Sequence, residues 1–253
     1  MRKLLSIIIL LFVCLTNAQV DKDSIKVNGD FLLGLNASGG NIPSYSGNLK
    51  SNIILTHNAW ELALSPSYTI AYTPVNGVAT LTKREFYTTF TGSHFLSKKW
   101  KVLEFSELEN SFAQKIDLRY NAGVGPSYKI LDNDKFQFNL SEVVLYEKLT
   151  TSRVGVNDYN IVRASTRAKF IYKMKSCTFS TIQLLQPAIY TDQHISTYEH
   201  FIYRTNSRLD YALSKKVSVG ITYDTALQRY AAFSTGTIKP FDWTTTFSIS
   251  YKL

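Results

Sequence analysis

Four arginines are the residues whose type and spacing are best suited to chemistry. Arg163 and Arg167 lie four residues apart, as do Arg204 and Arg208. On a β-strand this spacing places both guanidinium groups of a pair on one side of the sheet. Guanidinium groups bind anions and form bidentate ion pairs with carboxylates. The spacing therefore predicts either an anion-binding surface or a network of ion pairs between strands.

The same side of the predicted strands carries other charges of both signs. The candidates are Glu61, Glu85, Asp117, Arg119, Arg163, Arg167, Lys169, Arg204, Arg208, Asp210 and Asp224. If that side lines a lumen, an excess of basic groups would favour anions. Interleaved signs instead favour ion pairs that cross-link a narrow lumen and fill it. We expect the charged, largely filled lumen, and keep a narrow anion-preferring pore or solute channel as the alternative.

Other patterns offer little support for catalysis. His194-Ile195-Ser196 has the His-x-Ser spacing of the outer-membrane phospholipase dyad, but Thr197-Tyr198 replaces the Asn-Gly that follows the serine there. A lipid hydrolase is therefore the weakest alternative. Gly123-x-Gly125 lacks the third glycine of a phosphate-binding loop. The four histidines show no metal-ligand spacing with Cys or carboxylates. We expect no catalytic residue, no cofactor and no metal.

The elements that must position the charged residues are β-strands. Between residues 117 and 130, apolar residues such as Leu118, Tyr120 and Val124 alternate with polar residues such as Arg119 and Asn121. The turn 132–134 follows, and the alternation resumes, so the stretch predicts a β-hairpin. One face is continuously apolar and the other polar, which is typical of a transmembrane barrel with lipid outside and water inside.

The whole chain repeats this pattern. Predicted strands span residues 25–37, 45–55, 60–72, 81–95, 100–112, 117–130, 135–147, 160–173, 178–191, 201–213, 217–230 and 243–253. Because Pro66 cannot donate to a strand ladder, we expect a bulge there. Short and long connections alternate, as in bacterial barrels. The predicted fold class is all-β, an up-and-down antiparallel transmembrane β-barrel of about 12 strands.

Composition and the N-terminal segment fit an exported barrel. The chain has 253 residues, 45% of them hydrophobic, with 16 Tyr and 15 Phe. Arg2 and Lys3 precede an apolar stretch, and Thr16-Asn17-Ala18 resembles a cleavage site, so residues 1–18 are a predicted signal peptide and 19–253 the barrel domain. The net charge of +9 is the sole feature that would suit nucleic acid, which an exported barrel does not meet. We expect none as a partner.

Aromatic and terminal residues indicate the partners instead. Aromatic residues near strand ends fit the two interfacial girdles of a barrel, among them Trp100, Tyr128 and Trp243. The last strand alternates Phe247, Ile249 and others with polar residues, and resembles the strand that bacterial assembly machinery recognises. The expected partners are outer-membrane lipid and the barrel-assembly machinery, and the expected location is the outer membrane. The sequence leaves the oligomeric state open.

Several short motifs resemble one family. They are Leu96-Ser97 with Trp100, Asp117-Leu118-Arg119, Gly123-x-Gly125-x-x-Tyr128 and residues 138–147. Together they resemble the salt-induced outer-membrane protein family, a domain family of unknown function, over residues 31–253. The resemblance implies an outer-membrane barrel of the Gram-negative envelope and gives no catalytic residue. A structural or envelope-stress role is therefore the expected function.

Overall fold

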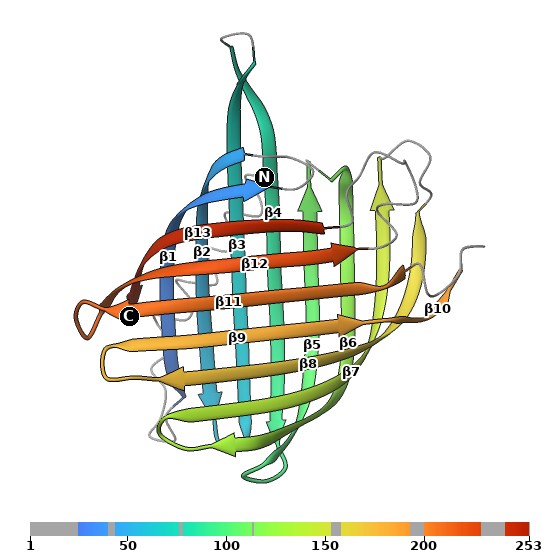
Figure 1. Cartoon of the computed structure of the whole chain (residues 1–253). Helices are drawn as coiled ribbons and strands as arrows, with labels where there is room; N and C mark the ends of the chain where they lie inside the picture. Colours follow the sequence, from blue (N-terminus) through green and yellow to red (C-terminus); the bar gives the residue numbers. More distant parts are fainter. Residues whose placement is uncertain are drawn as a thin grey trace.

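The computed structural model describes residues 25–39, 44–75, 78–112, 114–152, 158–192, 200–228 and 241–252. The described chain is folded into one antiparallel sheet that curves round and closes on itself (Figure 1). Its strands are β1 (Lys26–Gly39), β2 (Ser44–His57), β3 (Trp60–Val75), β4 (Val78–Phe95), β5 (Trp100–Ser111), β6 (Ile116–Asp132), β7 (Phe136–Thr151), β8 (Tyr159–Lys173), β9 (Cys177–Gln186), β10 (Ala188–Thr191), β11 (Ile202–Ala212), β12 (Val217–Gln228) and β13 (Phe241–Lys252). No helix within these residues is long and apolar enough to cross a bilayer.

The barrel is closed by pairing between its first and last strands. β1 pairs with β13 over ten residues, from Asp30 opposite Lys252 to Gly39 opposite Trp243. β9 and β10 both pair with β8 and are separated by Pro187, which has no N–H to donate. The two segments together occupy one position in the wall. The barrel therefore has twelve strand positions, and the predicted fold class is confirmed.

The bulge expected at Pro66 is not present. Pro66 lies opposite Thr88 of β4 in unbroken register, and the register shift in this pair of strands falls between Ala71 and Tyr72. On the β2 side, the same register holds on both sides of Pro66, with Ser67 opposite Lys50 and Leu64 opposite Ile53. The proline thus leaves out a ladder bond without adding a residue to the strand.

Inner and outer side chains alternate along the strands, as the periodicity predicts. In β7, Ser141, Val143, Leu145, Glu147 and Leu149 are buried, whereas the residues between them are exposed. The outer surface carries large apolar side chains, including Leu35 (73% exposed), Ile249 (61%) and Val144 (57%). A barrel that exposes such residues on its outside requires an apolar solvent there, which lipid provides.

Three of the short turns share one construction. Ser97 Oγ accepts hydrogen bonds from the backbone N–H groups of Lys99 (3.2 Å) and Trp100 (3.0 Å). Ser214 Oγ likewise accepts from the N–H groups of Lys216 (3.2 Å) and Val217 (3.0 Å). Asn133 Oδ1 accepts from those of Lys135 (3.1 Å) and Phe136 (2.8 Å). The β2–β3 turn is tighter, and Asn58 adopts a positive φ of 50°, which asparagine tolerates.

Some predicted features lie outside the described residues. They are the signal peptide at residues 1–18, the His194-Ile195-Ser196 pattern and the terminal Leu253.

Candidate functional site

The lumen collects ten of the eleven charged residues that the sequence predicts for it. On the inner face lie Glu61, Glu85, Arg119, Arg163, Arg167, Lys169, Arg204, Arg208, Asp210 and Asp224. Asp117 is the exception. A register shift between Ile116 and Leu118 turns Ile116 inward. Asp117 is therefore exposed, and its Oδ1 accepts a hydrogen bond from Ser152 Oγ (3.2 Å).

The half of the lumen along β5 to β8 is filled by ion pairs. Arg163 of β8 forms a bidentate pair with Glu147 of β7, with Nε–Oε2 and Nη2–Oε1 distances of 3.0 and 3.2 Å. Both side chains are almost completely buried, at 2% and 3% exposed. Arg163 Nη1 also donates to the carbonyl oxygen of His200. The guanidinium group thus ties His200, which lies just before β11, to the inside of the wall.

A second group of charges is centred on Glu107 of β5. Its carboxylate accepts hydrogen bonds from Tyr87 Oη (2.5 Å) and Asn121 Nδ2 (2.9 Å). Arg204 Nη1 lies 3.9 Å from Glu107 Oε1. Arg204 belongs to β11, which is five strand positions from β5 in one direction and seven in the other. This contact therefore crosses the lumen and joins opposite walls.

Sequence reasoning missed Glu107, its neighbour Glu109 and Glu147. Glu109 pairs with Arg119 of β6 at 2.7 Å. In β5, the inner face carries the apolar Leu103 and Phe105 beside these glutamates, while Glu104 is exposed on the outside. The polarity of the two faces is therefore mixed, and hydrophobic alternation alone could not assign them. A signal was present in Lys101, Glu107 and Glu109, which share one face at period two.

Apolar side chains complete the filled half. Ile116, Leu149, Tyr159 and Ile161 form one buried cluster on the inner side of the wall. Leu103, Val143 and Leu145 form another. The sequence predicts that charged groups fill the lumen, and in this half inward apolar residues pack together with the ion pairs.

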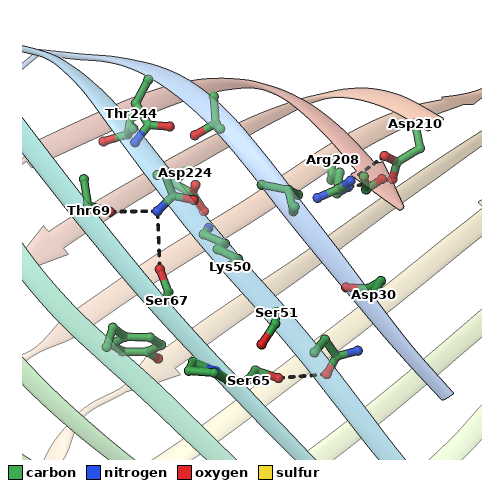
Figure 2. A pocket seen from close by; sticks show the side chains of 18 of the residues that line it. Asp30, Lys50, Ser51, Ser65, Ser67, Thr69, Arg208, Asp210, Asp224 and Thr244 are labelled. Atoms are coloured by element: carbon green, nitrogen blue, oxygen red, sulfur yellow. Dashed lines mark hydrogen bonds and ion pairs between the residues drawn. The ribbon is translucent and has the colours of Figure 1, made fainter. Parts of the chain in front are cut away.

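The opposite half of the lumen holds a cavity of about 750 Å³ (Figure 2). Most of its wall is formed by residues of β1 to β4 and of β11 to β13. Of its 31 lining residues, 14 are serines, threonines or asparagines and ten are charged. Asn48 Nδ2 donates to Thr69 Oγ1 (2.7 Å) and Ser67 Oγ (3.3 Å), and Ser65 Oγ donates to Asn52 Oδ1 (2.9 Å). These bonds hold a polar lining in place on β2 and β3.

The cavity reaches both ends of the described strands. Its lining includes Lys175, in the short turn between β8 and β9, and Gln114, in the connection between β5 and β6 at the other end. The cavity therefore extends along the barrel wall over much of the length of the described strands. Its polar lining makes the cavity suited to hold water.

Charges along the cavity are balanced in sign. Among the described residues, its basic lining residues are Lys50, Lys83, Lys175, Arg208 and Lys252, and its acidic ones are Asp30, Glu85, Glu109, Asp210 and Asp224. Some are paired, as in Lys83–Glu85 at 3.1 Å and Arg208–Asp210 at 2.6 Å. Paired charges of opposite sign largely cancel at a distance, so the cavity does not present a predominantly basic field.

Two titratable groups lie at the loop end, outside the strands. The side chain of His200 is 1% exposed, and burial together with the nearby Arg163 lowers its pKa to about 4. Asp192 accepts hydrogen bonds from the backbone and side chain of Asn160 at 3.0 and 2.7 Å, which lower its pKa. Within the described residues, no three His, Cys, Asp or Glu residues are grouped to hold a metal ion.

Comparison with solved structures identifies the same architecture. The NanC porin matches 88% of this chain and 100% of its own, with a TM-score of 0.59 and 11% sequence identity. The KdgM porin in complex with disordered oligogalacturonate matches 88% of this chain and 98% of its own, with a TM-score of 0.50 and 9% identity. At these identities the likeness establishes the barrel fold alone.

Comparison of sequences gives the family. No curated protein matches the chain. The family model described as "Protein of unknown function, DUF481" matches residues 32–253, a range that starts within β1 and includes every later strand. The chain therefore belongs to the DUF481 family.

Proposed function

We propose that the protein is a non-enzymatic channel of the outer membrane that passes small hydrophilic solutes through the open half of its lumen. The observation that carries the proposal is the cavity of about 750 Å³ whose polar lining reaches both ends of the described strands. The apolar outer surface and the porin-like fold support the membrane location.

The size and charge of the cavity define the class of solute. Spread over a hydrocarbon core of ~30 Å, the volume corresponds to a mean cross-section of ~25 Å², which suits solutes of monosaccharide size or smaller. Hydroxyl and amide groups provide both donors and acceptors. Because the lining charges balance, we expect neutral and zwitterionic solutes to pass, with weak selectivity between cations and anions. The excess basic charge of the whole chain would not make the pore strongly anion-selective.

Adjacent residues on β3 provide a matched test. Ser67 lines the cavity, whereas the side chain of Tyr68 points to the outer face. In planar bilayers, Ser67→Trp should reduce conductance several-fold by narrowing the passage, and Tyr68→Trp should leave it unchanged. In liposome-swelling assays with neutral sugars of increasing size, Ser67→Trp should likewise slow sugar entry, and Tyr68→Trp should leave it unchanged. A wild-type conductance at the level of bare lipid would refute the channel.

The filled half favours one second candidate, a closed structural or envelope-stress barrel. The specific observation is the cross-lumen contact between Arg204 and Glu107, together with the buried Glu147–Arg163 pair. Under this candidate the wild-type protein does not conduct, and loss of the barrel sensitises cells to salt or detergent. Conductance of the wild type therefore separates the two functions directly.

A further inference from the structure

The short-turn end of the barrel is rich in exposed lysines. Besides Lys175 and Lys252, which line the cavity, seven exposed lysines among the described residues lie there, and we call these seven the lysine rim: Lys26, Lys98, Lys99, Lys135, Lys173, Lys215 and Lys216. Two exposed acidic residues, Asp132 and Asp134, lie at the same end of the described chain, and Asp132 is paired with Lys129 at 3.0 Å. The rim is therefore strongly basic.

The rim originates in a repeated turn sequence. Leu-Ser-Lys-Lys occurs at residues 96–99 and again at 213–216, in turns that are far apart in sequence. In both, the serine side chain fixes the turn, so the two lysines project from equivalent positions. Lys135 occupies the equivalent position in the β6–β7 turn, where Asn133 replaces the serine.

Backbone hydrogen bonds join these turns to neighbouring strand ends. The N–H of Lys129 donates to the carbonyl oxygen of Lys99 (2.9 Å), and that of Lys173 to Lys135 (2.8 Å). The N–H of Lys252 donates to Lys216 in the same way (2.9 Å). The lysines thus stand on a rigid edge of the barrel, and their spacing is set by the spacing of the strands.

Aromatic residues lie directly beside the rim on the outer surface. Trp60, Trp100 and Tyr251 are 46%, 49% and 44% exposed. Lys216 Nζ lies 5.7 Å from the centroid of the Tyr251 ring. Exposed Trp and Tyr side chains mark the level where the hydrocarbon core meets the headgroups. The ammonium groups therefore lie at headgroup height.

We propose that the lysine rim binds the phosphate groups of anionic phospholipids in the leaflet at the short-turn end of the barrel. Basic clusters next to a membrane attract anionic lipids, with each lysine adding to the attraction. Among the described residues, the exposed charges of the other end are mixed in sign, with Arg84, Lys115 and Lys148 beside Asp117, Asp158 and Asp192. The inference rests on the proposed membrane location and is independent of conduction.

Native mass spectrometry of the full chain in micelles with equimolar phosphatidylglycerol and phosphatidylcholine tests the proposal. The wild type should retain phosphatidylglycerol in excess. The variant K98Q/K99Q/K215Q/K216Q should lower the ratio of retained phosphatidylglycerol to phosphatidylcholine at least about threefold, and K98R/K99R/K215R/K216R should keep it. Heat-modifiable gel mobility confirms that each variant is folded.

A matched pair of double variants locates the effect. K98Q/K99Q should lower the lipid ratio, whereas K115Q/K148Q, which removes the same charge from the opposite end, should not. Equal retention of the two lipids by the wild type would overturn the proposal, as would an equal loss in both double variants. Displacement of bound phosphatidylglycerol by millimolar inorganic phosphate would show that the rim prefers free phosphate to lipid, and would also overturn it.

Discussion

Replacing Arg204 by Ala should both destabilise the barrel and widen its lumen. Arg204 Nη1 is 3.9 Å from Glu107 Oε1 across the lumen. At an effective dielectric constant of about 20, two unit charges at this distance attract by about 4 kcal/mol. The Arg204 side chain is 23% exposed, so water screening and desolvation offset part of that attraction. We therefore expect the free energy of unfolding to fall by about 2 kcal/mol.

Arg208→Ala is the matched control. Arg208 faces the same lumen four residues along β11, but its partner Asp210 is on its own strand, and both side chains are about one-quarter exposed. Loss of such a local pair costs about 1 kcal/mol or less. In Arg204→Ala, Glu107 keeps its hydrogen bonds from Tyr87 and Asn121 and the electrostatic attraction of Arg119, but loses the contact with the cation across the lumen. The added change Glu107→Gln should therefore restore part of the lost stability.

Urea unfolding in lipid vesicles and single-channel recording measure the two effects. Arg204→Ala should unfold at lower urea than Arg208→Ala, and its conductance should exceed that of the wild type because a side chain no longer spans the lumen. If the two variants unfold within about 0.5 kcal/mol of one another and conduct alike, the contact does not hold the walls together and the reasoning is refuted.

Three further changes test other parts of the structure. The pKa of His200 is about 4 in the folded protein and 6.5 ordinarily, so the unfolded state binds a proton first as the pH falls. The free energy of unfolding should therefore drop by at most about 3 kcal/mol between pH 6.5 and 4. In urea unfolding, His200→Gln should abolish this part of the pH dependence. Gly125→Ala should lower the free energy of unfolding by more than about 3 kcal/mol or prevent folding, because the added Cβ would lie 1.9 Å from the carbonyl oxygen of Glu142. Gly47 has open space around it, so Gly47→Ala should fold like the wild type. A heat-modifiability gel compares the two variants. Glu142→Leu, which removes an exposed carboxylate from the outer surface of β7, should raise stability in lipid by about 1 kcal/mol, and a decrease would show that the carboxylate has a partner there besides Thr166.

Strand periodicity was sufficient to predict the barrel, since each predicted strand lies within a few residues of an observed one. Alternation is a local property of the chain, and the lipid outside enforces it strictly. The same rule assigned Arg163 and Arg204 to the lumen. It could not assign their partners, because Glu107 reaches Arg204 across the barrel and no local pattern records which walls face each other. It also could not foresee the turned Asp117, which depends on a single extra residue opposite β7.

The sequence also could not predict that one half of the lumen is packed and the other half contains a cavity. Val143, Leu145 and Leu149 alternate with exposed residues, and apolar residues at this spacing would fit the lipid-facing side as well as the lumen side. Their inward orientation follows from the register with β6 and β8, which is set by the whole sheet. The polar cavity beside a packed wall therefore becomes evident only once all strands are placed.

The pairing of β1 with β13 has a consequence for how the molecule comes into being. Leu33 lies opposite Ile249, so the ladder that completes the cylinder joins the two extremes of the chain. Hairpins between successive strands can form early, because they close short loops, whereas this last ladder carries the greatest loop-closure entropy. Until it forms, β1 and β13 are open edges whose unpaired backbone groups the hydrocarbon core of the bilayer cannot satisfy. Insertion and closure are therefore coupled, and a chain in which β1 has not paired with β13 has no stable inserted intermediate.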